Sequence, residues 1–184
     1  MAGQPSSPNW WLAFRGTLAT QVFAGGGVIW FLLGQQEQNF SWPVLFFFAP
    51  GVSISVTAVP YSGGDFSGFT TSSALGPTDF NSWGAVTSVG VALGAGGSEL
   101  SVNFYSVDHS PNPIGVEGVD IGLGVNVGWC PGRFKVLDWL MVANQGSTIG
   151  QPMAWLDDSP DLSDAVADAT SDYVQNNTDP SYIV

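Results

Sequence analysis

The sequence has one cysteine, one histidine and three basic residues among 184. A single cysteine, Cys130, excludes an internal disulfide framework. One cysteine and one histidine cannot supply the three or four ligands of a typical zinc site. Nucleic-acid binding needs clustered lysine or arginine to neutralise phosphates, whereas this chain has a formal net charge of −12. We therefore expect no metal, no cofactor and no nucleic-acid partner.

The chain also lacks the features of an export signal or a membrane anchor. Its first residues, MAGQPSSPNWW, carry no basic residue before the apolar part, unlike a secretory signal peptide. The best candidate for a transmembrane segment, residues 10–33, contains Arg15 and three consecutive glycines at 25–27. A spanning helix needs about 20 mostly apolar residues. We therefore expect a cytoplasmic protein, or one exported by a non-classical route.

Glycine and aromatic residues are abundant where charge is scarce. Only 10% of residues are charged, whereas 45% are hydrophobic and 24 are glycine. Eight tryptophans and twelve phenylalanines supply ample material for a core. Acidic residues gather near the end of the chain, where residues 157–184 hold seven aspartates and no basic residue. We predict a flexible N-terminus at 1–8, one domain at 9–156 and an acidic tail, helical or disordered, at 157–184.

Alternation of apolar and polar residues with a period of two dominates the chain. Residues 28–34 and 44–48 are instead continuous apolar runs, which are typical of short strands buried on both faces. Residues 83–93 and 99–107 flank the sequence GAGGS, which predicts a hairpin with a glycine-rich loop. The chain shows no helical crossover pattern. It is predicted to be all-β, with about eight strands in a small antiparallel closed β-barrel or a sandwich.

The segment 118–129, GVDIGLGVNVGW, alternates most strictly. Its odd positions hold valine, isoleucine, leucine and tryptophan, and its even positions hold glycine, aspartate and asparagine. We interpret it as a late strand whose apolar face packs into the core. The glycine face would allow bending or the close approach of a neighbouring backbone. The sequence CPG at 130–132 predicts a turn at its end.

Three residues are candidates for catalysis. His109 follows Asp108, and neighbouring strand residues point to opposite faces, so the two cannot form a local triad. Without a distant partner, His109 is expected to be an exposed loop histidine. Cys130 lies near Arg133 and Lys135, whose charges would lower a thiol pKa and favour a nucleophile. The structural alternative for Cys130 is a partly buried small residue at a turn.

The aromatic residues supply a predicted surface for a ligand or partner. Its members are Trp10, Trp11, Trp83, Tyr105 and Trp129.

Part of the sequence resembles a known family. GGDFSG at 63–68 is followed by Trp83–Gly84, by LSVNFYSVD at 100–108 and by a small-residue strand that ends at Trp129. Over residues 50–129, this order of motifs is similar to that of the virulence-associated protein (Vap) family of intracellular actinobacterial pathogens. The chain departs from the family in its shorter hairpin before residue 100 and in its continuation over 134–184. The resemblance implies a compact eight-stranded barrel without an open cavity or catalytic site, acting as a secreted host-interaction protein, in at least one case on membranes.

Four functions follow from these patterns. The sequence favours a non-enzymatic β-barrel interaction protein, of the secreted effector or virulence type, that acts on membranes or on a protein partner. One alternative is a lipocalin-like barrel that binds a small apolar ligand. The others are a structural or assembly subunit that forms homo-oligomers, and a small-barrel enzyme that uses His109 or Cys130.

Overall fold

The computed structural model of the chain describes residues 6–17, 27–37, 40–48, 67–143, 164–168 and 171. These residues form a mostly β structure with a single-turn 3-10 helix, η1 (Pro77–Phe80), and a short α-helical segment at 164–168. The strands are β1 (Ser7–Thr17), β2 (Gly27–Gln35), β3 (Phe40–Phe48), β4 (Ser67–Leu75), β5 (Trp83–Phe104), β6 (His109–Ser110), β7 (Ile114–Val136) and β8 (Val142–Ala143).

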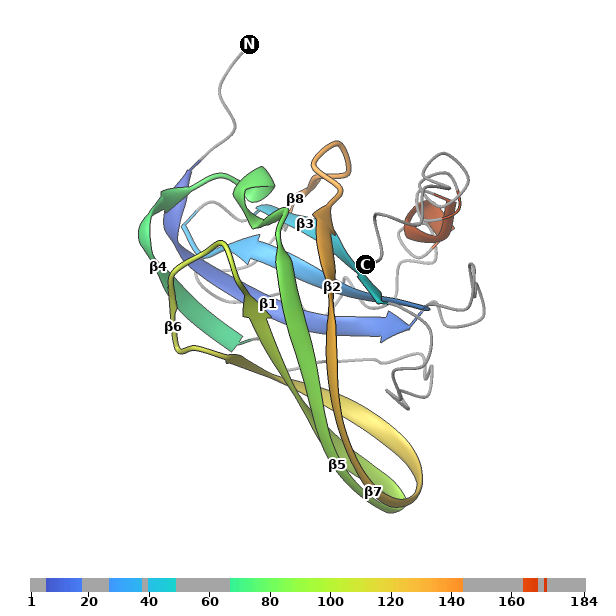
Figure 1. Cartoon of the computed structure of the whole chain (residues 1–184). Helices are drawn as coiled ribbons and strands as arrows, with labels where there is room; N and C mark the ends of the chain where they lie inside the picture. The colour runs from blue at the N-terminus through green and yellow to red at the C-terminus, as the bar shows by residue number, and fades with distance from the viewer. Residues whose placement is uncertain are drawn as a thin grey trace.

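The eight strands belong to one sheet, in which every pairing is antiparallel. Its order is β5-β7-β3-β2-β1-β4-β6, with β8 paired to β3. The sheet curls into a nearly closed barrel, as Figure 1 shows. This arrangement confirms the prediction of an all-β antiparallel barrel.

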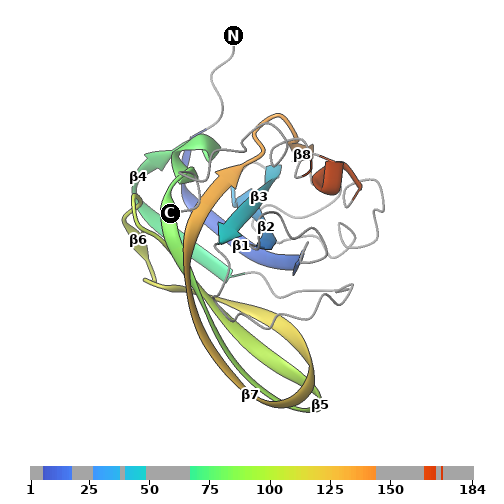
Figure 2. The same cartoon turned by 45° about the vertical axis from the view of Figure 1, so that its right-hand side comes forward.

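The strands β1, β2 and β3 are buried on both faces. Along β1, Trp10 and Leu12 belong to the cluster inside the barrel, whereas Trp11 and Ala13 belong to a second cluster on the outer face. Val166, from the helical segment, is fully buried in this outer cluster (Figure 2). This cover explains the continuous apolar runs of β2 and β3, because each strand packs against hydrophobic side chains on both sides.

Aromatic rings fill the interior of the barrel. The ring centroids of Phe104 and Phe134 lie 4.4 Å apart, and those of Phe46 and Phe134 lie 4.6 Å apart. Trp10 meets the edge of Phe80 at 4.8 Å. These spacings are typical of favourable ring packing. The core is therefore a network of interlocking aromatic side chains.

The strands β5 and β7 form one long two-stranded ribbon. Their register runs without a shift from the pair Trp83–Arg133 to the pair Val102–Ile114. The middle of the ribbon extends away from the other strands and curves back on itself (Figures 1 and 2). The backbone N–H of Tyr105 donates a hydrogen bond to the carbonyl oxygen of Trp83 at 2.9 Å. The two ends of the ribbon therefore meet on the barrel.

Two predicted turns are absent from this ribbon. The glycine-rich residues 94–98 were expected to form a hairpin loop, but β5 continues through them. The predicted turn at 130–132 is wrong for the same reason, because β7 continues to Val136. Each strand finds a hydrogen-bonding partner in the other throughout, so the glycines allow the pair to curve instead of ending a strand.

The predicted termini are partly covered by the structure. The strand β1 begins at Ser7, so two residues of the expected flexible N-terminus, 1–8, belong to the sheet. In the expected acidic tail, 157–184, residues 164–168 are helical. The other residues of the tail, apart from residue 171, lie outside the described part of the chain.

Candidate functional site

His109 is buried, and both of its ring nitrogens have backbone partners. It pairs with Thr71 across β6 and β4, and its ring meets the edges of Phe69 and Phe104. The Phe104 N–H donates to Nε2 at 3.4 Å, so Nδ1 carries the proton and donates to the Pro111 carbonyl oxygen at 2.9 Å. The expected exposed loop position is therefore wrong, because the β6–β4 pairing draws the ring inward. This histidine has a structural role in the folded barrel.

Cys130 is also buried, within β7 and opposite Val86. Burial raises the pKa of its thiol to about 12, because the apolar surroundings disfavour the thiolate. The thiol donates a long hydrogen bond of 3.8 Å to the Pro131 carbonyl oxygen. Arg133 and Lys135 occupy odd positions of the strand, on the face opposite Cys130. They therefore do not produce the activated nucleophile that their closeness in sequence suggested.

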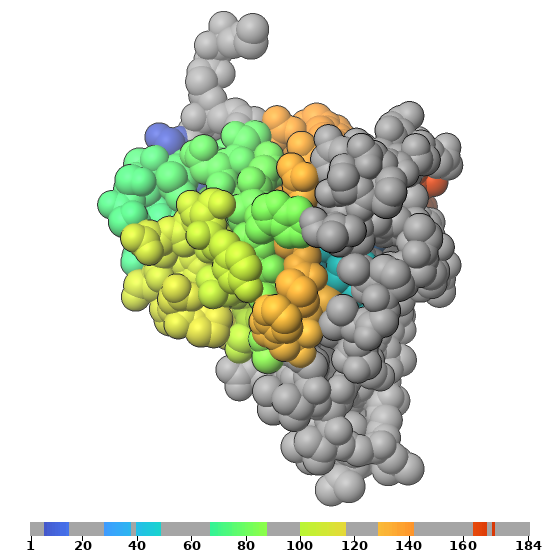
Figure 3. All heavy atoms as spheres, in the orientation of Figure 1, coloured from blue at the N-terminus to red at the C-terminus, as the bar shows by residue number. Residues whose placement is uncertain are grey.

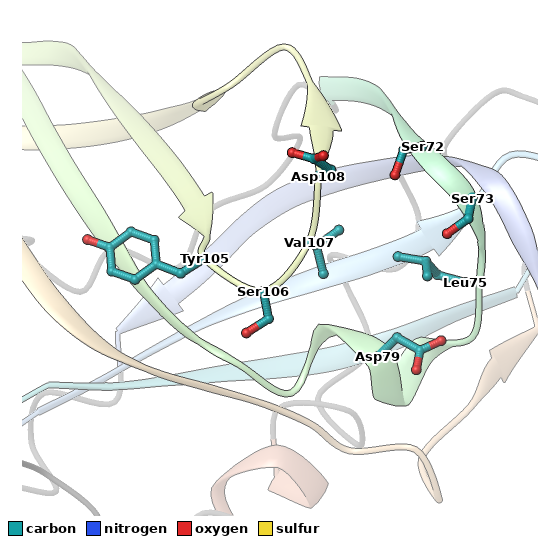
Figure 4. Close-up of a pocket in the computed structure, with 8 residues that line it drawn as sticks. All are labelled: Ser72, Ser73, Leu75, Asp79, Tyr105, Ser106, Val107 and Asp108. Atoms are coloured by element: carbon teal, nitrogen blue, oxygen red, sulfur yellow. The ribbon is translucent and has the colours of Figure 1, made fainter.

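Asp108 lines an open surface pocket of about 420 Å³, drawn in Figure 4. A second carboxylate, Asp79, lies across the pocket and accepts a hydrogen bond from the Gly76 N–H at 2.8 Å. Neither His109 nor Cys130 lines this pocket. The three catalytic candidates are thus not brought together. The residues that line the pocket are Ser72, Ser73, Leu75, Asp79, Tyr105, Ser106, Val107 and Asp108.

Two of the five predicted surface aromatics are in the protein interior. Trp10 is fully buried in the barrel, where its indole N–H donates to the Ser7 carbonyl oxygen at 2.7 Å. Trp11 is buried in the outer cluster, with its indole over Gly34. Both corrections have one cause, since β1 has hydrophobic neighbours on its two faces.

The other three predicted aromatics are exposed, and we call them the aromatic face. Trp83 is 40%, Tyr105 is 55% and Trp129 is 60% exposed. The backbones of Trp83 and Tyr105 are hydrogen-bonded neighbours, and the guanidinium of Arg133 lies 6.0 Å from the centre of the Trp83 ring. In Figure 3 the atoms of the two β5 ends, green and yellow, lie beside the orange atoms at the end of β7. The aromatic face is therefore assembled from both ends of the ribbon.

The exposure of Trp129 reverses the predicted orientation of segment 118–129. Odd positions were expected to face the core, but Trp129 is exposed whereas its even neighbour Cys130 is fully buried. At the other end of β7, the even residue Val116 is likewise buried in the core. The register has no shift between these ends. The glycine positions therefore lie on the face that continues the core-facing side of the barrel wall.

Sequence reasoning did not single out Trp139 and Met141. These side chains are 63% and 49% exposed after the end of β7. The segment 134–143 is apolar throughout, so its pattern offered no signal that separates an exposed tryptophan from a buried one.

Two further structural findings bear on function. Among the described residues, no three or more histidine, cysteine or acidic side chains group together in a way that would hold a metal ion. In the same part of the chain, no helix has the length and apolar character needed to cross a membrane.

Comparison with known proteins finds no match among protein-family models, curated proteins or solved structures. The resemblance to the virulence-associated protein family therefore stays a prediction. The first motif of that resemblance, GGDFSG, lies mainly outside the described residues, which begin again at Ser67.

Proposed function

We propose that this protein is a non-enzymatic β-barrel interaction protein that binds membrane surfaces through its aromatic face. The exposure of Trp83, Tyr105 and Trp129 beside one another is the observation that carries this proposal. Tryptophan and tyrosine are enriched at the boundary between membrane and water, where an apolar ring and a polar atom are both satisfied.

The charge of the chain indicates which lipids would be bound. A formal net charge of −12 opposes approach to anionic headgroups. Arg133 beside Trp83 supplies one local cation, whose guanidinium can meet a phosphate group of a zwitterionic lipid. We therefore expect a preference for neutral phosphatidylcholine over anionic membranes.

The surroundings of the catalytic candidates favour binding over catalysis. His109 uses both ring nitrogens to hold backbone groups, and the Cys130 thiol stays protonated at neutral pH. The aromatic packing of the interior disfavours the lipocalin-like alternative, since side chains occupy the space that an apolar ligand would need. The resemblance to the virulence-associated protein family supports an effector that acts on membranes.

Flotation with phosphatidylcholine vesicles at pH 7 and pH 5 tests the proposal. We expect the protein to float at both pH values, and more at pH 5, where protonated carboxylates are less costly to bring near lipid. Trp129→Ser should reduce the bound fraction about tenfold, whereas Trp139→Ser, a change at an equally exposed tryptophan outside the aromatic face, should leave it unchanged. Absence of flotation at both pH values, or an equal loss in the two variants, would overturn the proposal.

A further inference from the structure

The ribbon of β5 and β7 has two chemically different faces, and its ends identify them. At the barrel end, the odd residues Trp83 and Trp129 are exposed, whereas the even residues Val86 and Cys130 are buried. At the other end, the even residue Leu100 is buried in the core. Because the register is unshifted and side chains alternate along a strand, the same assignment holds for the middle of the ribbon. Odd positions there continue the outer face.

The odd positions in the middle of the ribbon are apolar in both strands. The ladder sets Val89 opposite Val127, Val91 opposite Val125 and Leu93 opposite Leu123. The even positions are glycine, alanine, serine, asparagine and aspartate. We call the apolar odd set the ribbon stripe: Val89, Val91, Leu93, Ala95, Val119, Ile121, Leu123, Val125 and Val127.

The stripe has a defined chemical boundary at each end. It begins beside Trp129 of the aromatic face and runs without a charged residue as far as Gly97 and Val119. The next pair on this face, Glu99 opposite Glu117, is acidic. The seven residues from Val89 to Ala95 extend over about 20 Å at the rise of a β-strand. An apolar band flanked by aromatic residues is the pattern of a strand surface that faces lipid.

We infer that the ribbon stripe enters the interfacial layer of a neutral bilayer together with the aromatic face, an inference that rests on the proposed function. The membrane is the occupant that these observations favour, because the stripe offers no polar group with which a protein partner would be recognised. The aromatic residues at its base match the depth of the headgroups. In this part of the described chain β5 and β7 pair only with each other, so their outer edges retain unpaired backbone groups. The ribbon is therefore expected to lie in the interface and not to cross the hydrocarbon.

Site-specific fluorescence tests this inference. In a Cys130→Ala background, which removes the only cysteine, single cysteines labelled with an environment-sensitive dye would be placed on both faces. Val91→Cys and Val125→Cys report on the stripe, and Ala92→Cys and Asn126→Cys are their matched neighbours on the glycine face. With phosphatidylcholine vesicles, we expect about a threefold or greater rise in emission from the two stripe labels and no change from the other two.

The outcomes separate this inference from the proposed function. If the protein floats but all four labels stay unchanged, or all four respond alike, the stripe inference is wrong and membrane binding by the aromatic face stands. If the protein does not float, the proposed function is wrong. If the stripe labels respond to rising protein concentration without vesicles, a second copy of the chain covers the stripe and the lipid assignment is overturned. Leu123→Ser should also weaken flotation about tenfold, whereas Asn126→Ser should not.

Discussion

The backbone N–H of Tyr105 donates a 2.9 Å hydrogen bond to the carbonyl oxygen of Trp83, although these residues stand at opposite ends of a 22-residue strand. The contact closes the β5–β7 ribbon on itself. It also brings two exposed aromatic side chains together with Trp129 on one surface. The binding surface that we propose therefore depends on how the ribbon folds back, and not on closeness in sequence.

The closure requires two glycines that face each other in the ladder, Gly84 and Gly132. A Cβ atom at Gly84 would meet the carbonyl oxygen of Asn103 and the ring of Phe134. A Cβ atom at Gly132 would likewise meet the backbone of β3 and an aromatic ring behind it. Backbone atoms cannot move aside as a flexible side chain can, so added volume strains the closed barrel.

We predict that Gly84→Ala and Gly132→Ala each lower the free energy of unfolding by about 1–3 kcal/mol. Urea denaturation followed by tryptophan fluorescence would measure this change. Gly76→Ala is the control, because its nearest neighbour would lie 3.8 Å from the new Cβ, and its effect should stay below about 0.5 kcal/mol. An effect of Gly84→Ala no larger than that of the control would contradict the close approach at the closure.

The buried thiol of Cys130 predicts a loss of stability in alkaline solution. Burial raises its pKa from 9.0 to about 12, so the folded state binds the proton more tightly than the unfolded state. The stabilisation is complete below about pH 9 and is lost as the pH rises toward 12, at up to about 1.4 kcal/mol per pH unit.

Denaturation of the wild type and of Cys130→Ala at pH 8 and pH 10.5 would isolate this effect from other titrating groups. We expect the wild type to lose about 2 kcal/mol more than the variant between the two pH values. Alkylation at pH 8 should be about a thousandfold slower in the folded protein than in urea, because the thiolate is scarce. Equal rates in the two states would show an accessible thiol.

The pair Glu99–Glu117 predicts that removal of a charge stabilises the ribbon. These residues stand directly opposite each other in the ladder, where like charges are destabilising. Glu99→Gln should raise the free energy of unfolding by about 0.2–1 kcal/mol at low ionic strength, and less in high salt. Glu37→Gln makes the same chemical change at a carboxylate that accepts hydrogen bonds from Ser7 and Asn9, and should destabilise the protein. If both variants shift stability in the same direction, the register assignment is not supported.

The cover of the outer face predicts a strong effect at Val166. This residue is fully buried among the outer-cluster side chains of β1, β2 and β3. Val166→Asp would place a carboxylate in that apolar cluster and should lower the free energy of unfolding by about 3 kcal/mol or more. Asp168→Asn, a change at an exposed position two residues further on, should alter it by less than about 0.5 kcal/mol. Thermal denaturation of both variants would distinguish a packed helix from a loosely attached tail.

Sequence reasoning predicted the aromatic residues of the candidate site in part. Trp83, Tyr105 and Trp129 were named and are exposed, whereas Trp10 and Trp11 were named and are buried. Side-chain type does not separate these groups, because tryptophan suits both a core and an interface. The difference comes from the number of layers that cover each strand, which the sequence of that strand alone does not state.

The sequence by itself determined the class of the fold. A period of two requires strands, continuous apolar runs require burial on both faces, and the absence of helical crossovers requires antiparallel pairing. Each of these follows from local chemistry, since side chains alternate along any strand whatever its neighbours are.

The tertiary structure alone decided which face of segment 118–129 belongs to the inner side of the barrel. Alternation states that two faces differ, but it is symmetric with respect to inside and outside. The choice is made at the ends of β7, where buried Val116 and Cys130 fix the even positions inward. One unshifted ladder then carries that parity through the glycines. The apolar residues of the ribbon are thereby assigned to the outer face, because a strand cannot change faces without a shift in register.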